Sequence, residues 1–254
     1  MAREEKRHDQ RNVFVIGVMM GILALTILIP AGMAYGQDRD RPAFTIVPRD
    51  TEAYGRTYAQ WSAAWNQWAD SIKVAEHPLF DNGPCEKGQS GPVWFLGGKF
   101  CANGANCAYA ANRSCSVPYG KALFFPIIDS EDSALEESVN EHPGLPDYQL
   151  INYLRSYTTG IDGAKDIFCQ IDHQPVQQLQ RYGVYSEAFG FTIPDDNLFR
   201  AVYPAPNDFQ QGTYFPGVDF GYYLMLQPLS PGVHTLHFGA SWLDIRYQIT
   251  VGSK

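Results

Sequence analysis

The densest group of ionisable side chains is an acidic run, which holds Asp129, Glu131, Asp132, Glu136 and Glu137. Carboxylates gathered in one place can bind calcium or act as the acid and base of glycoside hydrolysis. The spacing and the central glycine of an EF-hand loop are absent. We favour a plainer interpretation, in which these acids begin a helix and complement its dipole. Asp129, Glu131 and Asp132 are the candidate catalytic residues if the protein is an enzyme.

Aromatic rings alternate with prolines and amides over residues 197–223, where we expect a long loop. Rings on a loop can line a concave site for a sugar or another small molecule. Loops also fold such rings back over a core, and we weigh that outcome more heavily. If the loop binds a ligand, the candidate residues are Tyr203, Phe209, Tyr214 and Phe215.

Two other patterns resemble known sites but fail on context. Residues 88–92 contain a Gly-x-Ser-x pattern, but Pro92 takes the fifth position and a strand follows, so a nucleophile elbow is not expected. His234 and His237 lie three apart on a predicted strand and point to opposite faces, so they cannot chelate one ion. We expect His234 to be a hydrogen-bonded histidine near the core.

We find no triad, metal-ligand spacing or phosphate-binding loop in the sequence. We therefore expect no metal and no cofactor. The leading hypothesis is a non-catalytic domain that binds a glycan, a small molecule or a surface. The alternative is a hydrolase that acts on glycan outside the cytoplasm, through the clustered carboxylates.

A stripe of large apolar residues predicts one long helix over residues 51–74. The spacing alternates between four and three positions, which puts the stripe on one helical face. Such a stripe can stack on sugars or enter a membrane, but a helix that covers a sheet needs the same pattern, and we favour packing. The stripe consists of Tyr54, Tyr58, Trp61, Trp65, Trp68 and Ile72.

Short apolar or alternating segments predict strands through the rest of the chain. The clearest is residues 243–251, in which every second residue is apolar, as in a strand covered on one side. The others are residues 92–96, 115–128 with a turn at 118–120, 167–171, 185–193, 222–229 and 233–238.

Residues 129–160 interrupt this β pattern. Ser133 and Glu136 have the spacing of a capping box, and a second helix is expected over residues 147–157. The predicted fold is therefore mainly β: an antiparallel β-sandwich or jelly-roll-like domain with an aromatic-striped N-terminal helix and a short helical insertion.

The N-terminus predicts export. Basic residues within 1–12 precede an apolar run over 13–29, and small residues follow Pro30, as in a secretory signal peptide. We predict cleavage after Ala34 or Gly36, which leaves residues 37–254 as a single domain. The alternative is an uncleaved anchor, because the apolar run spans about 26 Å as a helix. That segment is then the only expected membrane contact.

The charge of the chain argues against two classes of partner. The formal net charge is −8, and it becomes −9 without residues 1–36, which carry four basic and three acidic side chains. Such a surface repels phosphate backbones and anionic lipids. We therefore expect no nucleic-acid partner. The sequence leaves the oligomeric state open.

Three stretches resemble a family of exported bacterial proteins that has no assigned activity. They are residues 88–96 (GQSGPVWFL), 115–127 (CSVPYGKALFFPI) and 228–239 (PLSPGVHTLHFG). With the Trp-rich helix, the resemblance covers most of residues 54–251. It implies a secreted, periplasmic or envelope location and a β-rich fold, and it carries over no catalytic residues. Members have a cysteine where this chain has Asp132, matched to a second one at Cys169, so the resemblance implies that Cys169 is unpaired.

All five cysteines follow the export signal, in a compartment where disulfides form. We predict a Cys85–Cys115 disulfide, because each residue borders a β segment of the resemblance. Cys101 and Cys107 lie between them and form a separate candidate pair. The alternative joins Cys169 to Cys101 or to Cys107.

Overall fold

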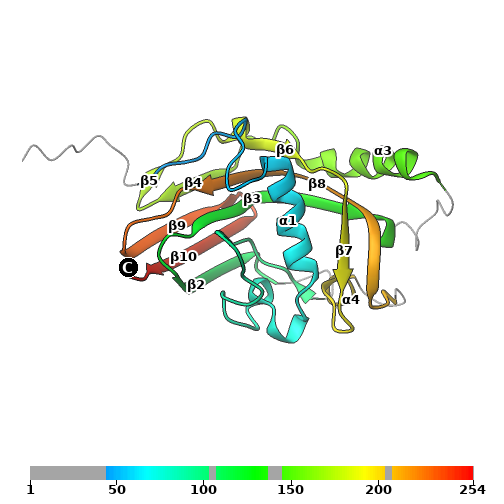
Figure 1. The fold of residues 1–254 in the computed structure, drawn as a ribbon, viewed down its shortest axis with the longest axis horizontal. Helices are drawn as coiled ribbons and strands as arrows, with labels where there is room; N and C mark the ends of the chain where they lie inside the picture. The colour runs from blue at the N-terminus through cyan, green and yellow to red at the C-terminus, as the bar shows by residue number, and fades with distance from the viewer. Residues whose placement is uncertain (1–43, 103–106, 137–144, 204–207, 254) are drawn as a thin grey trace, which may run out of the picture. The chain divides into compact units, whose positions relative to one another are not determined.

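The computed structural model of the 254-residue chain describes residues 44–102, 107–136, 145–203 and 208–253. The predicted signal peptide, residues 1–36, lies outside these ranges. Within these ranges the protein is mainly β, as predicted, with two five-stranded sheets and a few helices (Figure 1). None of the helices in the described ranges has the length and apolar character needed to cross a bilayer.

The first sheet has the strand order β1-β3-β8-β6, and β7 also pairs with β8. Its pairs are antiparallel except β1–β3, which is parallel. β3 is buried on both faces over most of its length, which explains its position between two other strands. The strands are β1 Val93–Phe95, β3 Ala122–Ser133, β6 Gly183–Tyr185, β7 Phe189–Ile193 and β8 Gly212–Leu226.

The second sheet has the strand order β2-β10-β9-β4-β5, and its β2–β10 pair is parallel. The two parallel pairs correct the expectation of purely antiparallel sheets. In β10 every second residue is buried, from Leu243 to Val251, as predicted. The strands are β2 Ala110–Val117, β4 Phe168–Ile171, β5 Gln174–Pro175, β9 Gly232–Ala240 and β10 Leu243–Val251.

The turns at 118–120 and 230–232 connect the two sheets. β2 belongs to the second sheet and β3 to the first, and β8 and β9 are divided in the same way. The strands on either side of each turn form as expected. They do not pair with each other, so neither turn makes a hairpin. A core of aliphatic and aromatic residues from both sheets fills the space between them, including Phe125 and Phe238, whose rings lie 5.0 Å apart.

The aromatic helix, α1 Tyr58–Asp70, covers the other face of the first sheet (Figure 1). It is shorter than the predicted 51–74. Thr57 Oγ1 accepts the N–H of Gln60, and Gln60 Oε1 accepts the N–H of Thr57, so a capping box fixes the first turn. Tyr54 has a positive φ of 53° and lies outside the helix.

The helical insertion begins later than the predicted residue 129. β3 extends to Ser133, because residues 129–133 pair with β8, and the helix after it begins only at Ala134. Residues 137–144 lie outside the described ranges. The second helix is present as α3 Asp147–Thr158. The remaining helical segments are η1 Val74–Glu76, η2 Pro78–Phe80, η4 Thr159–Ile161, η5 Leu179–Tyr182 and α4 Leu198–Val202.

The expected loop over residues 197–223 is mostly regular structure, since it contains α4 and most of β8. The aromatic residues of this segment had suggested a loop because prolines separate them. Pairing of β8 with β3, β6 and β7 holds residues 212–223 extended despite Pro216.

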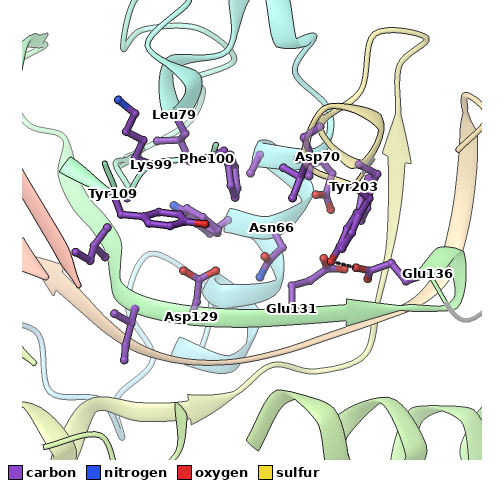
Figure 2. A pocket seen from close by; sticks show the side chains of 18 of the residues that line it. Asn66, Asp70, Leu79, Lys99, Phe100, Tyr109, Asp129, Glu131, Glu136 and Tyr203 are labelled. Carbon is purple, nitrogen blue, oxygen red and sulfur yellow. Dashed lines mark hydrogen bonds between the residues drawn. The ribbon is translucent and has the colours of Figure 1, made fainter. Parts of the chain in front are cut away.

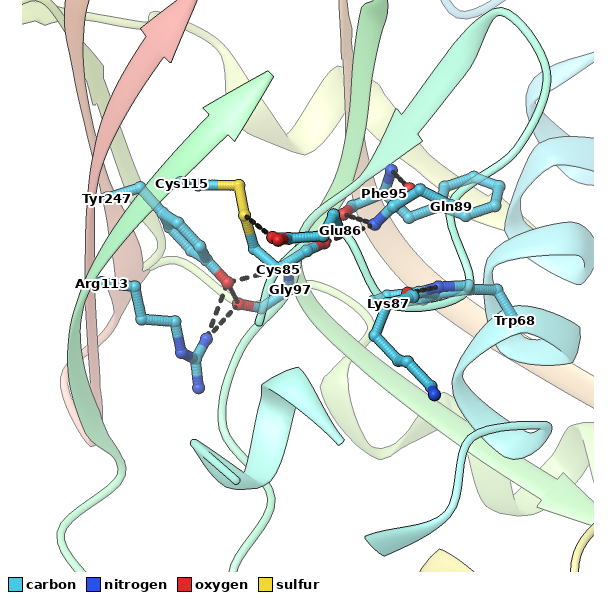
Figure 3. Close-up of a disulfide and its surroundings, with 10 residues drawn as sticks. All are labelled: Trp68, Cys85, Glu86, Lys87, Gln89, Phe95, Gly97, Arg113, Cys115 and Tyr247. Carbon is cyan, nitrogen blue, oxygen red and sulfur yellow. Dashed lines mark hydrogen bonds between the residues drawn. A yellow bond between two sulfur atoms is a disulfide. The ribbon is translucent and has the colours of Figure 1, made fainter. Parts of the chain in front are cut away.

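Both predicted disulfides are present. Cys85 pairs with Cys115 at a Cα–Cα distance of 5.7 Å (Figure 3), and Cys101 pairs with Cys107. Cys169 is a buried thiol in β4, and burial raises its pKa. Two disulfides are typical of proteins that fold in an oxidising compartment outside the cytoplasm.

The double variant Cys85→Ser/Cys115→Ser should lose much of the stability of the protein. The bond closes a ring with a sequence separation of 30, and a ring of this size constrains the unfolded chain by roughly 3.5 kcal/mol. Thermal unfolding should show a strongly reduced melting temperature, whereas Cys169→Ser should change it only through packing. A drop no larger than that of Cys169→Ser would contradict the expectation.

Candidate functional site

A cavity of about 220 Å³ lies beside α1, β3, α4 and residues 98–100 (Figure 2). Two kinds of side chain dominate its wall. The carboxylates are Asp70, Asp129, Glu131 and Glu136, and the aromatic rings are Trp65, Phe100, Tyr109, Phe199, Tyr203 and Trp242. We call this cavity the acidic pocket.

A β-bulge in β3 determines which way its acids point. Before the bulge, Phe124 packs against α1, while Phe125 packs between the sheets. The register with β8 then shifts between Pro126 and Ile128, so Ile127 is an extra residue. Both Ile127 and Ile128 belong to the core between the sheets. The alternation of faces is therefore reversed after the bulge.

This reversal turns Asp129 and Glu131 toward α1 and the acidic pocket. Without it, regular alternation would bury both carboxylates between the sheets. Bulges that re-aim side chains occur preferentially next to active sites. Asp129 lies opposite Gly221 of β8. A Cβ at Gly221 would lie only 2.9 Å from the Cβ of Asp129 and 2.5 Å from the ring of Tyr223, so glycine leaves the room that Asp129 needs.

Asp70 enters the pocket from α1, at an unfavourable position for an acid. It is the last residue of the helix and is 3% exposed. The C-terminus of a helix carries partial negative charge, and this last turn contains no basic residue. Within the described residues, the Oδ2 atom of Asp70 has no hydrogen-bond partner. Exceptions of this kind to local rules are expected at functional sites.

Glu136 is held by two hydroxyl groups. Tyr203, at the end of α4, donates to Oε1 at 2.5 Å, and Ser133 donates to Oε2 at 3.1 Å. Ser133 and Glu136 therefore do contact each other, but through their side chains and not as the capping box that their spacing suggested, because the N–H of Ser133 donates to Asp132. Figure 2 shows Tyr203 above Glu131 and Glu136, so this ring closes one end of the pocket.

The pKa values of the pocket acids are all raised. Burial raises the pKa of Asp129 and of Glu136 to about 7 each. Burial, and then the charges of neighbouring acids, raise the pKa of Asp70 and of Glu131 well above their ordinary values. The pKa of Asp219, which lies opposite Glu131 on β8, is raised for the same reasons. Several perturbed carboxyls in one cavity indicate a functional site.

The side chain of Arg113 holds the start of residues 98–100, the segment that forms part of the pocket wall. Its Nη1 atom donates to the carbonyl oxygens of Gly97 and Gly98 at 3.1 and 2.7 Å, and also bonds to Tyr247 (Figure 3). Its Nε donates to Asp81. Arg113 is in β2, two residues before Cys115, so the disulfide and this cluster fix the same region.

The structure brings together some of the predicted site residues. Asp129, Glu131 and Tyr203 line the acidic pocket. Asp132 accepts the N–H of Ser133 and, by its charge, raises the pKa of Glu136.

The other three aromatic candidates do not line the acidic pocket. Phe209 is buried in a third core cluster, with its ring 5.8 Å from Tyr203. Tyr214 packs against Phe191, and Phe215 is exposed.

Sequence reasoning missed Asn66 and Asp70 of α1, and Tyr109 and Trp242 at the pocket. Asn66 and Asp70 are four positions apart, so they share a helical face. The sequence offered one signal for Asp70, because an acid near the C-terminus of a predicted helix is unfavourable and can mark a functional residue. Tyr109 and Trp242 come from loops before β2 and β10, and only the pairing of those strands brings them into ring contact at 5.6 Å.

A second constellation resembles a catalytic triad. Nδ1 of His234 lies 2.7 Å from Oδ2 of Asp172, and Nε2 lies 3.3 Å from Oγ of Ser230. Nε2 is closer, at 2.9 Å, to the backbone carbonyl of Ser230, which can only accept a hydrogen bond. The ring therefore donates to that carbonyl and closes the turn before β9. His234 is a buried, hydrogen-bonded histidine, as expected.

The sequence matches no family model and no curated protein. Among solved structures, the chain is similar to the structure of PbICP-C in complex with falcipain-2, with 10% sequence identity. The match covers 65% of this chain and 100% of that chain, with a TM-score of 0.19. A likeness at this level supports no conclusion about fold or function, so the function must be argued from the acidic pocket itself.

Proposed function

We propose that this protein is secreted or periplasmic and binds a small ligand in the acidic pocket without transforming it. The observation that carries the proposal is Asp70. Its carboxylate is buried on the cavity wall, and its Oδ2 atom has no hydrogen-bond partner within the described residues. A buried polar atom without a partner is costly. A ligand that donates to Oδ2 would remove that cost.

Exposed rings at the pocket support the proposal. Tyr109 is 41% exposed and Trp242 is 56% exposed, and the two are in an edge-to-face contact. Exposed apolar side chains that lie together, unlike single ones, can mark a ligand-binding surface. These two offer a surface on which a ligand can stack at the edge of the cavity.

A thermal-shift screen with a metabolite and glycan set tests this proposal. Compounds that bind should raise the melting temperature of the wild-type protein. Val202→Trp places a large ring at the half-buried pocket position Val202 and should abolish the shift. The matched control is Val233→Trp, since Val233 is 61% exposed and is not part of the pocket wall. The proposal fails if no compound raises the melting temperature, or if Val202→Trp responds as the control does.

Glycan hydrolysis is the second candidate function, and Asp129 and Glu131 support it. They lie two positions apart on one face of β3, with Cα atoms about 6.6–6.8 Å apart. Carboxyl pairs at about 5–10 Å are typical of glycosidases. A pKa of about 7 at Asp129 fits a general acid at neutral pH.

Release of reducing ends from a glycan panel separates the two functions. The protein is an enzyme if the wild type hydrolyses a glycan and Glu131→Gln still binds that glycan but no longer hydrolyses it. Binding without release by either protein is the result that the non-catalytic proposal predicts.

A further inference from the structure

We infer that the ligand of the acidic pocket is a compact organic cation with one or more ammonium groups. The inference rests on the proposed function, because it names the ligand class of the same pocket. It follows from the charge of the wall, the arrangement of its carboxylates, its aromatic rings and its volume.

The wall carries more carboxylates than the described residues neutralise. Among the described residues that line the pocket, Lys99 carries the positive charge. Its Nζ atom already forms an ion pair with Asp81 at 3.0 Å. Tyr203 and Ser133 provide hydroxyl groups to Glu136 but no charge. A cavity lined by one sign of charge focuses the electrostatic potential and concentrates ions of the opposite sign. The pocket therefore favours a cation over a neutral ligand.

Two buried oxygens on the wall are ready to accept hydrogen bonds. They are Oδ2 of Asp70 and Oε1 of Glu131, and neither has a partner among the described residues. A cation bound beside these carboxyls favours their ionised form, which only accepts hydrogen bonds, and an ammonium group offers up to three donors together with that positive charge. Charge-assisted bonds of this kind are about twice as strong as neutral ones. A sugar hydroxyl would donate one bond and leave the charge in place.

The spacing of the carboxylates favours an organic cation over a metal ion. Within the described ranges, no three His, Cys, Asp or Glu side chains are grouped to hold a metal. Ca²⁺ requires its oxygen ligands at about 2.3–2.6 Å from one centre. Here Asp70 comes from the end of α1, Asp129 and Glu131 from the C-terminal half of β3, and Glu136 from the helix after it. Acids distributed along a wall suit N–H groups distributed over a molecule.

The aromatic rings complete a cation site. Trp65, Phe100 and Trp242 line the same cavity as the carboxylates. Ring faces attract ammonium and quaternary ammonium groups, and aromatic rings beside carboxylates recognise such ligands in other proteins. The volume of about 220 Å³ is below the range of about 300–1,000 Å³ for drug-sized ligands. The ligand is therefore compact.

Isothermal titration calorimetry with the purified protein at pH 8 and about 0.15 M salt, which screens surface charge, tests the inference. The probes are 1,4-diaminobutane, tetramethylammonium, MgCl₂, CaCl₂ and N-acetylglucosamine. We expect saturable binding of at least one of the two organic cations. Glu131→Gln should raise its Kd about tenfold, as loss of a charged hydrogen-bond partner does. The control Glu52→Gln changes an exposed acid outside the pocket and should leave the Kd unchanged.

Trp242→Ala provides a second variant that should fold normally, because Trp242 is half exposed. It should weaken tetramethylammonium binding more than diamine binding, since a quaternary ammonium has no N–H to donate and depends more on ring faces. Binding of N-acetylglucosamine or of a metal ion alone, with no organic cation bound, would overturn the inference about the ligand class and leave the pocket as the binding site. If an organic cation binds and Val202→Trp does not weaken that binding, the acidic pocket is not the binding site.

Discussion

The protein should become more stable as the pH falls from 8 to 6.5. Asp129 and Glu136 ionise near pH 4 in the unfolded chain and at about 7 in the folded protein. Between these values the folded state binds more protons, so the free energy of unfolding falls as the pH rises. From pH 8 to 6.5 these two carboxyls together should add about 1.5 kcal/mol. Asp70, Glu131 and Asp219, whose pKa values are also raised, act in the same direction.

Below pH 6.5 a buried histidine opposes this gain. Burial lowers the pKa of His77 to about 4, so the folded state resists the proton that the unfolded chain takes up near 6.5. This opposition already begins inside the window from pH 8 to 6.5, where half-protonation of His77 in the unfolded chain offsets about 0.4 kcal/mol of the gain from the acids. Urea unfolding across it should show a clear slope in the wild type and a smaller one in Asp129→Asn/Glu136→Gln. An equal slope in both proteins would contradict the assignment.

Trp65→Ala should destabilise the protein by about 3–5 kcal/mol, the usual cost of removing a buried tryptophan. Trp65 is 2% exposed, and its Nε1 donates to the carbonyl of Leu96 at 2.7 Å. Its ring also lies 6.2 Å from that of Tyr223 in an edge-to-face contact. The variant loses a large core side chain and leaves a buried carbonyl unpaired. Denaturant unfolding measures the change in free energy.

The matched control for Trp65→Ala is Trp242→Ala. Trp242 is 56% exposed, so the control should change stability by no more than about 0.5 kcal/mol. Trp65 also lines the acidic pocket, so if Trp65→Ala instead keeps full stability and loses only ligand binding, its ring serves the site and does not support the core. That result would restore the sugar-stacking interpretation of the aromatic stripe.

Local sequence patterns predicted the elements that depend on local physics. The alternation from Leu243 to Val251 identified β10, because one face of that strand is covered and the other is open to water. The aromatic stripe identified α1, although its spacing continued to Tyr54 and Ile72, beyond the helix. The N-cap at Thr57 sets the true start, since a capped turn outweighs a continued stripe.

The acidic pocket depends on long-range pairing, which the sequence shows only in part. The bulge at Ile127 decides that Asp129 and Glu131 face α1, and it exists because β3 pairs with β8 in a shifted register. An acidic composition had suggested a helix start over residues 129–133, but pairing with β8 makes this segment a strand. The contribution of Asp70 likewise requires the packing of α1 against that sheet.

If the pocket carboxylates serve a ligand and not the fold, neutralising one of them should stabilise the protein without its ligand. The most direct test is the free energy of unfolding of Asp70→Asn at pH 8, measured by urea denaturation without ligand. We predict that Asp70→Asn is more stable than the wild type by about 1–2 kcal/mol, as expected when a functional residue that strains the fold is neutralised. The exposed control Glu52→Gln should show no such gain. A less stable Asp70→Asn would mean that this carboxylate supports the fold, and it would contradict the account.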